Sequence, residues 1–154
     1  MPRLIALVGL ALVLIATPSL AQAPMHTVAM PDTLKWVQPG TLPPGAQLAI
    51  VQGDPGKEGP FVYRVKVPAN YKVPPHFHKA VENVTVLSGV FYIGMGPKFD
   101  AGAGQEIPTG GYFSVPATHQ HYAWTTAGEA LIQVHGVGPT DITYVNPADD
   151  PRKK

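Results

Sequence analysis

Apolar and polar residues alternate along this chain in short runs, and glycine- or proline-rich turns separate the runs. The clearest run is Phe61–Val67, in which the odd-numbered residues are apolar while Arg64 and Lys66 fall on the other face. Many short strands with Gly and Pro turns between them are typical of a β-sandwich or barrel. We therefore predict an all-β domain over residues 46–146. The other predicted strands are Ala46–Val51, Glu82–Leu87, Val90–Ile93, Tyr112–Val115, His121–Thr125, Leu131–Val137 and Ile142–Val145.

The segments on either side of these runs lack the alternation. Residues 22–45 hold five prolines and little periodicity, which predicts an irregular N-terminal arm. Trp36, Val37 and Leu42 are the apolar residues able to hold part of this arm against the body. Residues 147–154 form a charged C-terminal tail, for which a solvated end is the simplest prediction.

The first residues have the order of a secretory signal peptide. A basic start at Arg3 precedes thirteen apolar or small residues, Leu4–Ala16, and small residues then surround the candidate cleavage sites after Ala21 and Ala23. The apolar run is shorter than the roughly 20 residues of a membrane helix. We predict that residues 1–21 are cleaved, so that the mature chain has no membrane span and is periplasmic or secreted. Cleavage after Ala23 and an uncleaved N-terminal anchor are the alternatives.

Composition narrows the classes of function. The 154 residues include no cysteine, so a thiol nucleophile, a cysteine zinc site and a disulfide framework are excluded. The formal net charge is +1, without the basic excess that is typical of a nucleic-acid-binding protein. The 16 glycines and 18 prolines disfavour a helical bundle, and a hydrophobic content of 45% disfavours global disorder. A β-rich protein with no nucleic-acid partner is the class that remains.

Candidate chemistry is concentrated in the histidines, four of which form two close pairs, His76 with His78 and His119 with His121. In an extended strand, residues i and i+2 project from the same face, so His76 and His78 can direct both imidazoles at one divalent ion. Glu82 follows in an apolar run, where a carboxylate is costly to bury without a partner such as a metal. Spacing alone leaves a second interpretation open, in which these histidines are loop residues and Glu82 faces solvent.

The stretch around the first pair resembles the first signature of the cupin superfamily, G-x5-H-x-H-x3-4-E-x6-G. His76, His78, Glu82 and Gly89 match this signature, and Asn70 stands at its leading glycine. Asparagine also adopts turn conformations, so this replacement is a mild one.

The stretch around the second pair resembles the second cupin signature, G-x5-P-x-G-x2-H-x3-N. Gly110, Pro116 and His121 match it, while Thr118 replaces the glycine and Thr125 replaces the asparagine. The two signatures and their flanking strands cover most of the chain after the arm.

The resemblance implies a small double-stranded β-barrel, of the cupin or jelly-roll type, with a mononuclear metal centre inside. By position, the metal ligands are His76, His78, Glu82 and His121. Three imidazoles and a carboxylate suit a divalent ion such as Fe, Mn, Ni, Cu or Zn, whose identity the ligands leave open. Motif spacing favours His121 over His119, which then lies at the pocket rim as a hydrogen-bond donor or as a solvated loop residue.

Three further residues are candidates for a catalytic role. Tyr63 lies on the inward face of its predicted strand, and Gln133 and His135 share one face of theirs. If that face is turned into the barrel, His135 could transfer protons near neutral pH. The alternative for His135 is a hydrogen-bonded core or surface histidine.

Two functions from different classes follow from the resemblance. The first is an exported metal-dependent enzyme on a small organic substrate, with oxygenase, lyase or decarboxylase, and isomerase chemistry all open, and dioxygenase chemistry if the metal is iron. The second is a non-catalytic periplasmic module that binds a metal or a small ligand. Cupins often dimerise, and a Pro-rich arm is able to reach a second subunit, so a homodimer is an alternative to a monomer.

Overall fold

A computed structural model describes residues 26–154, and the predicted signal peptide, residues 1–21, and the second cleavage site at Ala23 lie outside the described residues. Within the described part of the chain no helix is long and apolar enough to cross a membrane. The all-β prediction is confirmed, because the regular elements of residues 26–154 are strands and short 3-10 helices. The strands are β1 (Gln47–Gln52), β2 (Gly59–Val67), β3 (Lys72–Phe77), β4 (Glu82–Met95), β5 (Gln105–Pro108), β6 (Tyr112–Val115), β7 (His121–Trp124), β8 (Ala130–Gly138) and β9 (Thr143–Tyr144).

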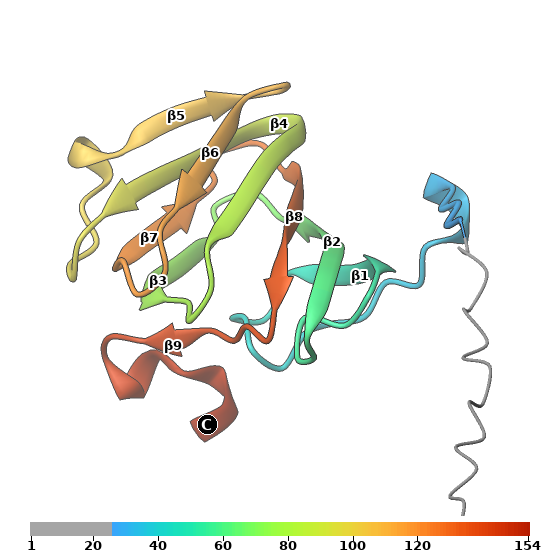
Figure 1. The fold of residues 1–154 in the computed structure, drawn as a ribbon. Helices are drawn as coiled ribbons and strands as arrows, with labels where there is room; N and C mark the ends of the chain where they lie inside the picture. The colour runs from blue at the N-terminus through green and yellow to red at the C-terminus, as the bar shows by residue number, and fades with distance from the viewer. Residues whose placement is uncertain (1–25) are drawn as a thin grey trace, which may run out of the picture.

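The strands form one curled antiparallel sheet in the order β1-β2-β8-β4-β7-β3-β9, with β5 and β6 also paired to β4 (Figure 1). The long strand β4 joins the two halves of the curl. Its first part pairs with β8 and β6, and its second part pairs with β7 and β5. This strand therefore brings one half of the sheet over the other and creates an enclosed interior.

The sequence pattern divides β4 into two strands, and the structure shows why it is one strand with a bend. The register with β8 shifts between Val86 and Ser88, and Gly89 follows with a φ of 78°. A Cβ at Gly89 would lie 2.1 Å from the carbonyl oxygen of Glu129, so no other residue fits this close approach. The motif glycine is thus the point at which β4 turns from one half of the sheet to the other.

Strand β3 is a second difference from the prediction. Pro74 and Pro75 interrupt the sequence pattern there, because proline lacks the N–H that a sheet requires. The strand accommodates both prolines in an irregularity, since its register with β7 shifts between Val73 and His76. Pairing resumes at His76, opposite His121.

Alternate residues of β2, β4 and β8 point into the curl and form the core. A fully buried aliphatic or aromatic side chain stabilises the fold by about 1.5–3 kcal/mol, so these positions carry much of the stability. The core positions that are 6% exposed or less on these strands are Phe61, Val65, Val67, Val84, Val86, Phe91, Ile93, Ala130, Ile132 and Val134.

The N-terminal arm closes one end of the core. Leu42 packs against the core, and the carbonyls on either side of it accept tyrosine hydroxyls. Tyr144 donates to the Thr41 carbonyl at 2.8 Å, and Tyr71 donates to the Pro43 carbonyl. The predicted contact of the arm with the body is therefore made at this point by one partly buried side chain and two hydrogen bonds.

Earlier in the arm the contacts are looser. The Lys66 ammonium lies 4.3 Å from the centre of the Trp36 ring, on the outer face of the sheet. The main chain of Val37 exchanges two hydrogen bonds with Leu48 of β1, but the Val37 side chain is 58% exposed. Val37 is therefore held by its backbone and not by burial.

The C-terminal tail differs from the predicted solvated end. It forms two 3-10 helices, Pro147–Asp149 and Pro151–Lys153, and Asp150 between them is 7% exposed. Asp150 accepts hydrogen bonds from the Arg152 backbone and guanidinium, and Arg152 in turn donates to the Ile142 carbonyl at 3.0 Å. These contacts fold the tail back against the barrel.

Candidate metal centre

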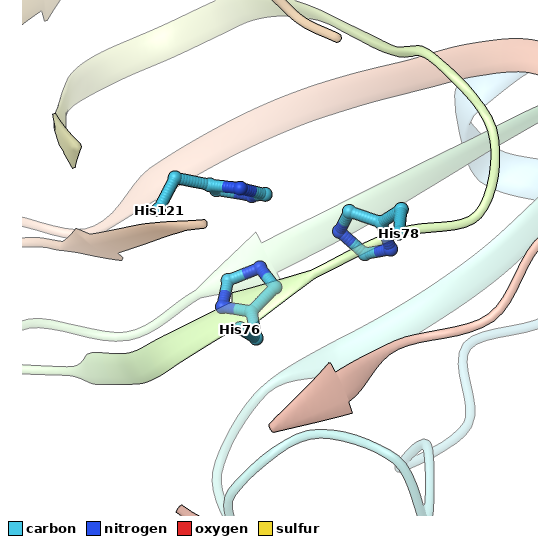
Figure 2. Close-up of side chains that lie close together, drawn as sticks. All are labelled: His76, His78 and His121. Carbon is cyan, nitrogen blue, oxygen red and sulfur yellow. The ribbon is translucent and has the colours of Figure 1, made fainter. Parts of the chain in front are cut away.

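The sheet brings the four predicted metal ligands together from three segments. His76 and His78 come from the end of β3, Glu82 is the first residue of β4, and His121 is the first residue of β7. Figure 2 shows the three imidazoles directed toward a common space. One nitrogen of each imidazole lies within 4.8 Å of the others, which is close enough for all three to hold one ion.

Backbone carbonyls fix the orientation and tautomer of each imidazole. A carbonyl oxygen only accepts hydrogen bonds, so each Nδ1 carries a proton and each Nε2 keeps a free lone pair. Metal-binding histidines typically have this arrangement, with the second ring nitrogen donating to a fixed acceptor. The contacts are His76 Nδ1 to the Pro74 carbonyl at 2.7 Å, His78 Nδ1 to the Asp141 carbonyl at 2.6 Å, and His121 Nδ1 to the His119 carbonyl at 3.0 Å.

Glu82 lies directly against two of these lone pairs. Its Oε1 is 3.5 Å from His78 Nε2, and its Oε2 is 3.3 Å from His121 Nε2. Among the described residues, both of these buried nitrogens have no hydrogen-bond partner. A buried polar atom without a partner costs about 1–3 kcal/mol, and a cation between the lone pairs removes that cost. The donor set therefore fits a divalent metal.

The charge states of the buried groups are the ones that a metal requires. Burial lowers the pKa of His76 to about 3, and the neighbouring imidazoles of His121 and His78 lower it further in the same direction. Burial opposes ionisation of Glu82, but the contact with His121 and the electrostatic attraction of the surrounding imidazoles outweigh it and lower its pKa to about 2. At neutral pH Glu82 is therefore a carboxylate and His76 a neutral imidazole, the deprotonated states in which these groups bind metal.

The replaced motif glycines keep the glycine backbone conformation. Asn70 has a φ of 56° and Thr118 has a φ of 63°, both in the left-handed region. The Thr118 backbone N–H donates to the His78 carbonyl at 2.7 Å, which ties the loop before His121 to the first motif. The motif geometry is therefore retained although its residue types differ.

Thr125 takes over a structural role at the asparagine position of the second motif. It is 3% exposed, and its hydroxyl donates to the Pro68 carbonyl at 2.6 Å while accepting from the Tyr71 backbone N–H at 3.0 Å. These bonds link the end of β7 to the turn before β3, the strand that carries His76.

The structure brings one of the three catalytic candidates to the cavity. Tyr63 lines it, and burial raises the pKa of this tyrosine, so its hydroxyl keeps the proton and remains a donor. Gln133 and His135 are not brought there, because Val134 between them points inward and turns both to the outer face. There Gln133 accepts a hydrogen bond from Arg64 Nε at 3.0 Å.

His119 and Asp141 act on the site through their main chains. The imidazole of His119 is exposed, as in the solvated-loop alternative, and its carbonyl orients His121. Asp141, whose carbonyl orients His78, was not among the predicted site residues. A backbone acceptor leaves no signal in residue type, so neither role is readable from a motif.

The four side chains form one wall of a cavity of about 200 Å³. Most of the other lining residues are apolar, and many of these come from β2, β4 and β8, with Leu42 contributed by the arm. Its mouth is marked by the partly or fully exposed lining residues that lie outside both the strands and the ligand set, in the arm, the β1–β2 turn and the β8–β9 loop. These mouth residues are Thr41, Leu42, Pro55, Thr140 and Asp141.

The curled sheet and its histidine cluster define the class of protein as a cupin, and comparison with known proteins gives the family. A model of the ChrR cupin-like domain matches residues 24–140. The chain therefore belongs to the ChrR cupin-like family, and the predicted resemblance to cupins is confirmed. A comparison with curated proteins finds no match.

Solved structures share this fold at low sequence identity. The polyketide cyclase RemF from Streptomyces resistomycificus gives a TM-score of 0.67 at 21% identity, over 84% of this chain and 92% of that chain. The DMSP lyase DddQ from Ruegeria pomeroyi DSS-3 gives 0.59 at 19% identity, over 75% and 64%. The Rhodobacter sphaeroides complex of SigE with the anti-sigma ChrR gives 0.53 at 18% identity, over 70% and 51%. At these identities the likeness concerns the fold alone.

Proposed function

We propose that this chain is an exported mononuclear-metal cupin that acts as an enzyme on a small organic substrate. One observation carries the proposal: buried Nε2 lone pairs of His78 and His121 meet the Glu82 carboxylate in the wall of an apolar cavity, with no proton donor among the described residues to pair them. His76 completes the set of ligands. Export is supported by the order of residues 1–21.

The ligands suit one divalent ion of Fe, Mn, Ni, Cu or Zn, held by His76, His78, Glu82 and His121. Such an ion would supply Lewis acidity, and redox chemistry as well if it is a redox-active metal such as iron.

The residues of the chain orient the ligands, exclude water and supply a proton donor. The carbonyls of Pro74, Asp141 and His119 hold the imidazoles in one tautomer, so the ligands need no rearrangement. The apolar lining excludes water from the reacting part of a bound molecule. Tyr63 keeps a phenolic proton available at the cavity wall.

Metal analysis with matched variants tests the centre. We expect protein purified from its natural compartment to contain about one metal ion per chain, and His78→Ala to lose it. His119→Ala is the control, because that imidazole is exposed and its carbonyl is unchanged by the substitution. Wild-type protein that takes up none of the five metals, by elemental analysis after reconstitution, would contradict the proposal.

A non-catalytic role in metal or small-ligand binding is the second candidate. It is favoured by the outward position of His135 and Gln133, which leaves the cavity without those two groups. Turnover of a broad panel of small organic molecules by metal-loaded protein, absent in His78→Ala, supports the enzyme. Full metal content without turnover on that panel supports the binding protein.

Export has its own test. Expression of the full chain followed by fractionation should place the protein in the periplasm or medium, with a mass that lacks residues 1–21. A chain of full mass in the cytoplasm would contradict this part of the proposal.

A further inference from the structure

The size of the cavity limits what can bind beside the metal centre. An apolar cavity of roughly 150 Å³ is large enough to bind benzene. The cavity here is about 200 Å³, and part of that space adjoins the ligand side chains. Its apolar part therefore accommodates a single six-membered ring or a chain of similar volume, and two linked rings exceed it.

The charges along the cavity limit the ligand further. No lysine or arginine is among its lining residues, and the charged side chains there are Glu82 and Asp141. Asp141 is exposed at the mouth and pairs with Lys79 at 3.1 Å. An ionised group placed in the apolar part would have no partner, which is energetically costly. A sulfonate, phosphate or carboxylate distant from the metal is therefore disfavoured.

One tyrosine hydroxyl, that of Tyr63, is placed to recognise an oxygen on such a molecule. Tyr63 of β2 is paired with Val134 of β8, which is paired in turn with Val84 of β4, two residues after Glu82 on the same face. A ring lying on these two valines thus has Tyr63 at one side and the metal ligands at the other. The other tyrosine in the lining, Tyr71, has its hydroxyl committed to a carbonyl of the arm.

We propose that the site binds an uncharged molecule of about one ring, with an oxygen that accepts a hydrogen bond from Tyr63. This inference rests on the proposed function. The ligand class is that of simple phenols and similarly sized cyclic or short-chain carbonyl compounds. Tyr63 is then the residue that selects oxygenated molecules over hydrocarbons of the same shape.

The experiment uses zinc-loaded protein, because zinc has no redox chemistry of its own, and isothermal titration with four probes. Phenol is the reference probe, and toluene has its shape without the oxygen. We expect toluene to bind about five-fold more weakly, the value of one hydrogen bond of roughly 1 kcal/mol. We expect 4-phenylphenol, which is too large, and phenol-4-sulfonate, which is charged, to bind at least about ten-fold more weakly than phenol.

Variants test whether Tyr63 causes the preference for phenol over toluene. Tyr63→Phe should abolish the preference for phenol over toluene while leaving toluene affinity and zinc content unchanged. Tyr112→Phe is the matched control, since that hydroxyl bonds Asn83 on the outer face of the sheet at 2.8 Å and should leave the preference intact. Val134→Phe should fill the cavity and abolish binding of both probes with zinc retained.

Zinc content measured on the same samples separates the two levels of the proposal. Full zinc with equal binding of phenol and toluene, or with tight binding of 4-phenylphenol or phenol-4-sulfonate, overturns the inference and leaves the metal centre standing. A protein that takes up none of the five metals, yet prefers phenol through Tyr63, supports the inference and refutes the proposed function.

Discussion

The two faces of strand β7 have opposite characters, although all four of its residues are buried. On the inner face, His121 presents a nitrogen without a partner in the described part of the chain. On the outer face, Tyr122 and Trp124 pack together with ring centroids 5.8 Å apart, and the Tyr122 hydroxyl donates to the Asp100 carbonyl at 2.8 Å. The outer face therefore stabilises the fold, while the inner face presents a nitrogen that is available to bind a ligand.

This separation gives a first prediction, which carries the largest effect. Trp124→Ala removes a side chain that is 5% exposed and contacts the rings of Tyr92 and Phe99, so it should lower the free energy of unfolding by about 3–5 kcal/mol. Denaturant unfolding of metal-free protein measures it. A loss below 1 kcal/mol would show that the outer face does not hold the fold.

Metal removal is the second prediction. With metal at about 100 times its Kd, binding stabilises the native state by roughly 2.7 kcal/mol, so a chelator should lower the Tm by roughly 5–10 °C. His121→Ala should melt at one temperature with or without chelator, and His119→Ala should keep the wild-type shift. A chelator-insensitive wild-type protein would remove the contrast between the two faces.

Glu82→Gln sharpens the same contrast with a smaller change. It keeps the shape of the side chain but removes the charge, so metal affinity should fall by at least about ten-fold while circular dichroism stays that of the native sheet. Competition with a colorimetric chelator measures the affinity. Collapse of the fold would assign Glu82 to structure instead of to the inner-face chemistry.

The smallest expected effect on stability concerns the C-terminal tail, which lies outside β7 and serves as a reference for the two faces of that strand. The hydrogen bonds from Arg152 lower the pKa of Asp150 from its ordinary value of 3.8. A lowered folded-state pKa adds stability above pH 3.8 that is lost as pH falls through the folded-state pKa. Asp150→Asn should therefore be less stable than wild type at neutral pH and equal to it in strong acid, by denaturant unfolding at several pH values. A difference that persists in acid would contradict this origin.

The sequence predicted the parts of the site that depend on the type of side chain at a position. The spacing of His76, His78, Glu82 and His121 can be read directly from residue types, and the structure gathers these residues as the motif implies. Whether they bind metal stays a prediction. The supporting acceptors, including the Asp141 carbonyl, could not be predicted because any residue supplies a carbonyl.

Strand parity explains why Gln133 and His135 do not reach the cavity. Leu131 and Ile132 are both apolar, so the alternation in β8 does not show which face is inward. The structure turns Ile132 and Val134 into the cavity, and the face that carries His135 is therefore outside. The pairing of β8 with β2 and β4 determines which face of β8 points inward, and the sequence of β8 alone does not contain this information.

The tyrosine contacts of the arm imply an order of events as the polypeptide is made. Tyr144 bonds to Thr41, which precedes it by 103 residues, so this closure must wait until nearly the whole chain has emerged. All the candidate ligands come earlier, the last of them being His121. The cavity around them is nevertheless completed only at this late stage, because its lining includes Val134 and Ile142 as well as Leu42 of the arm.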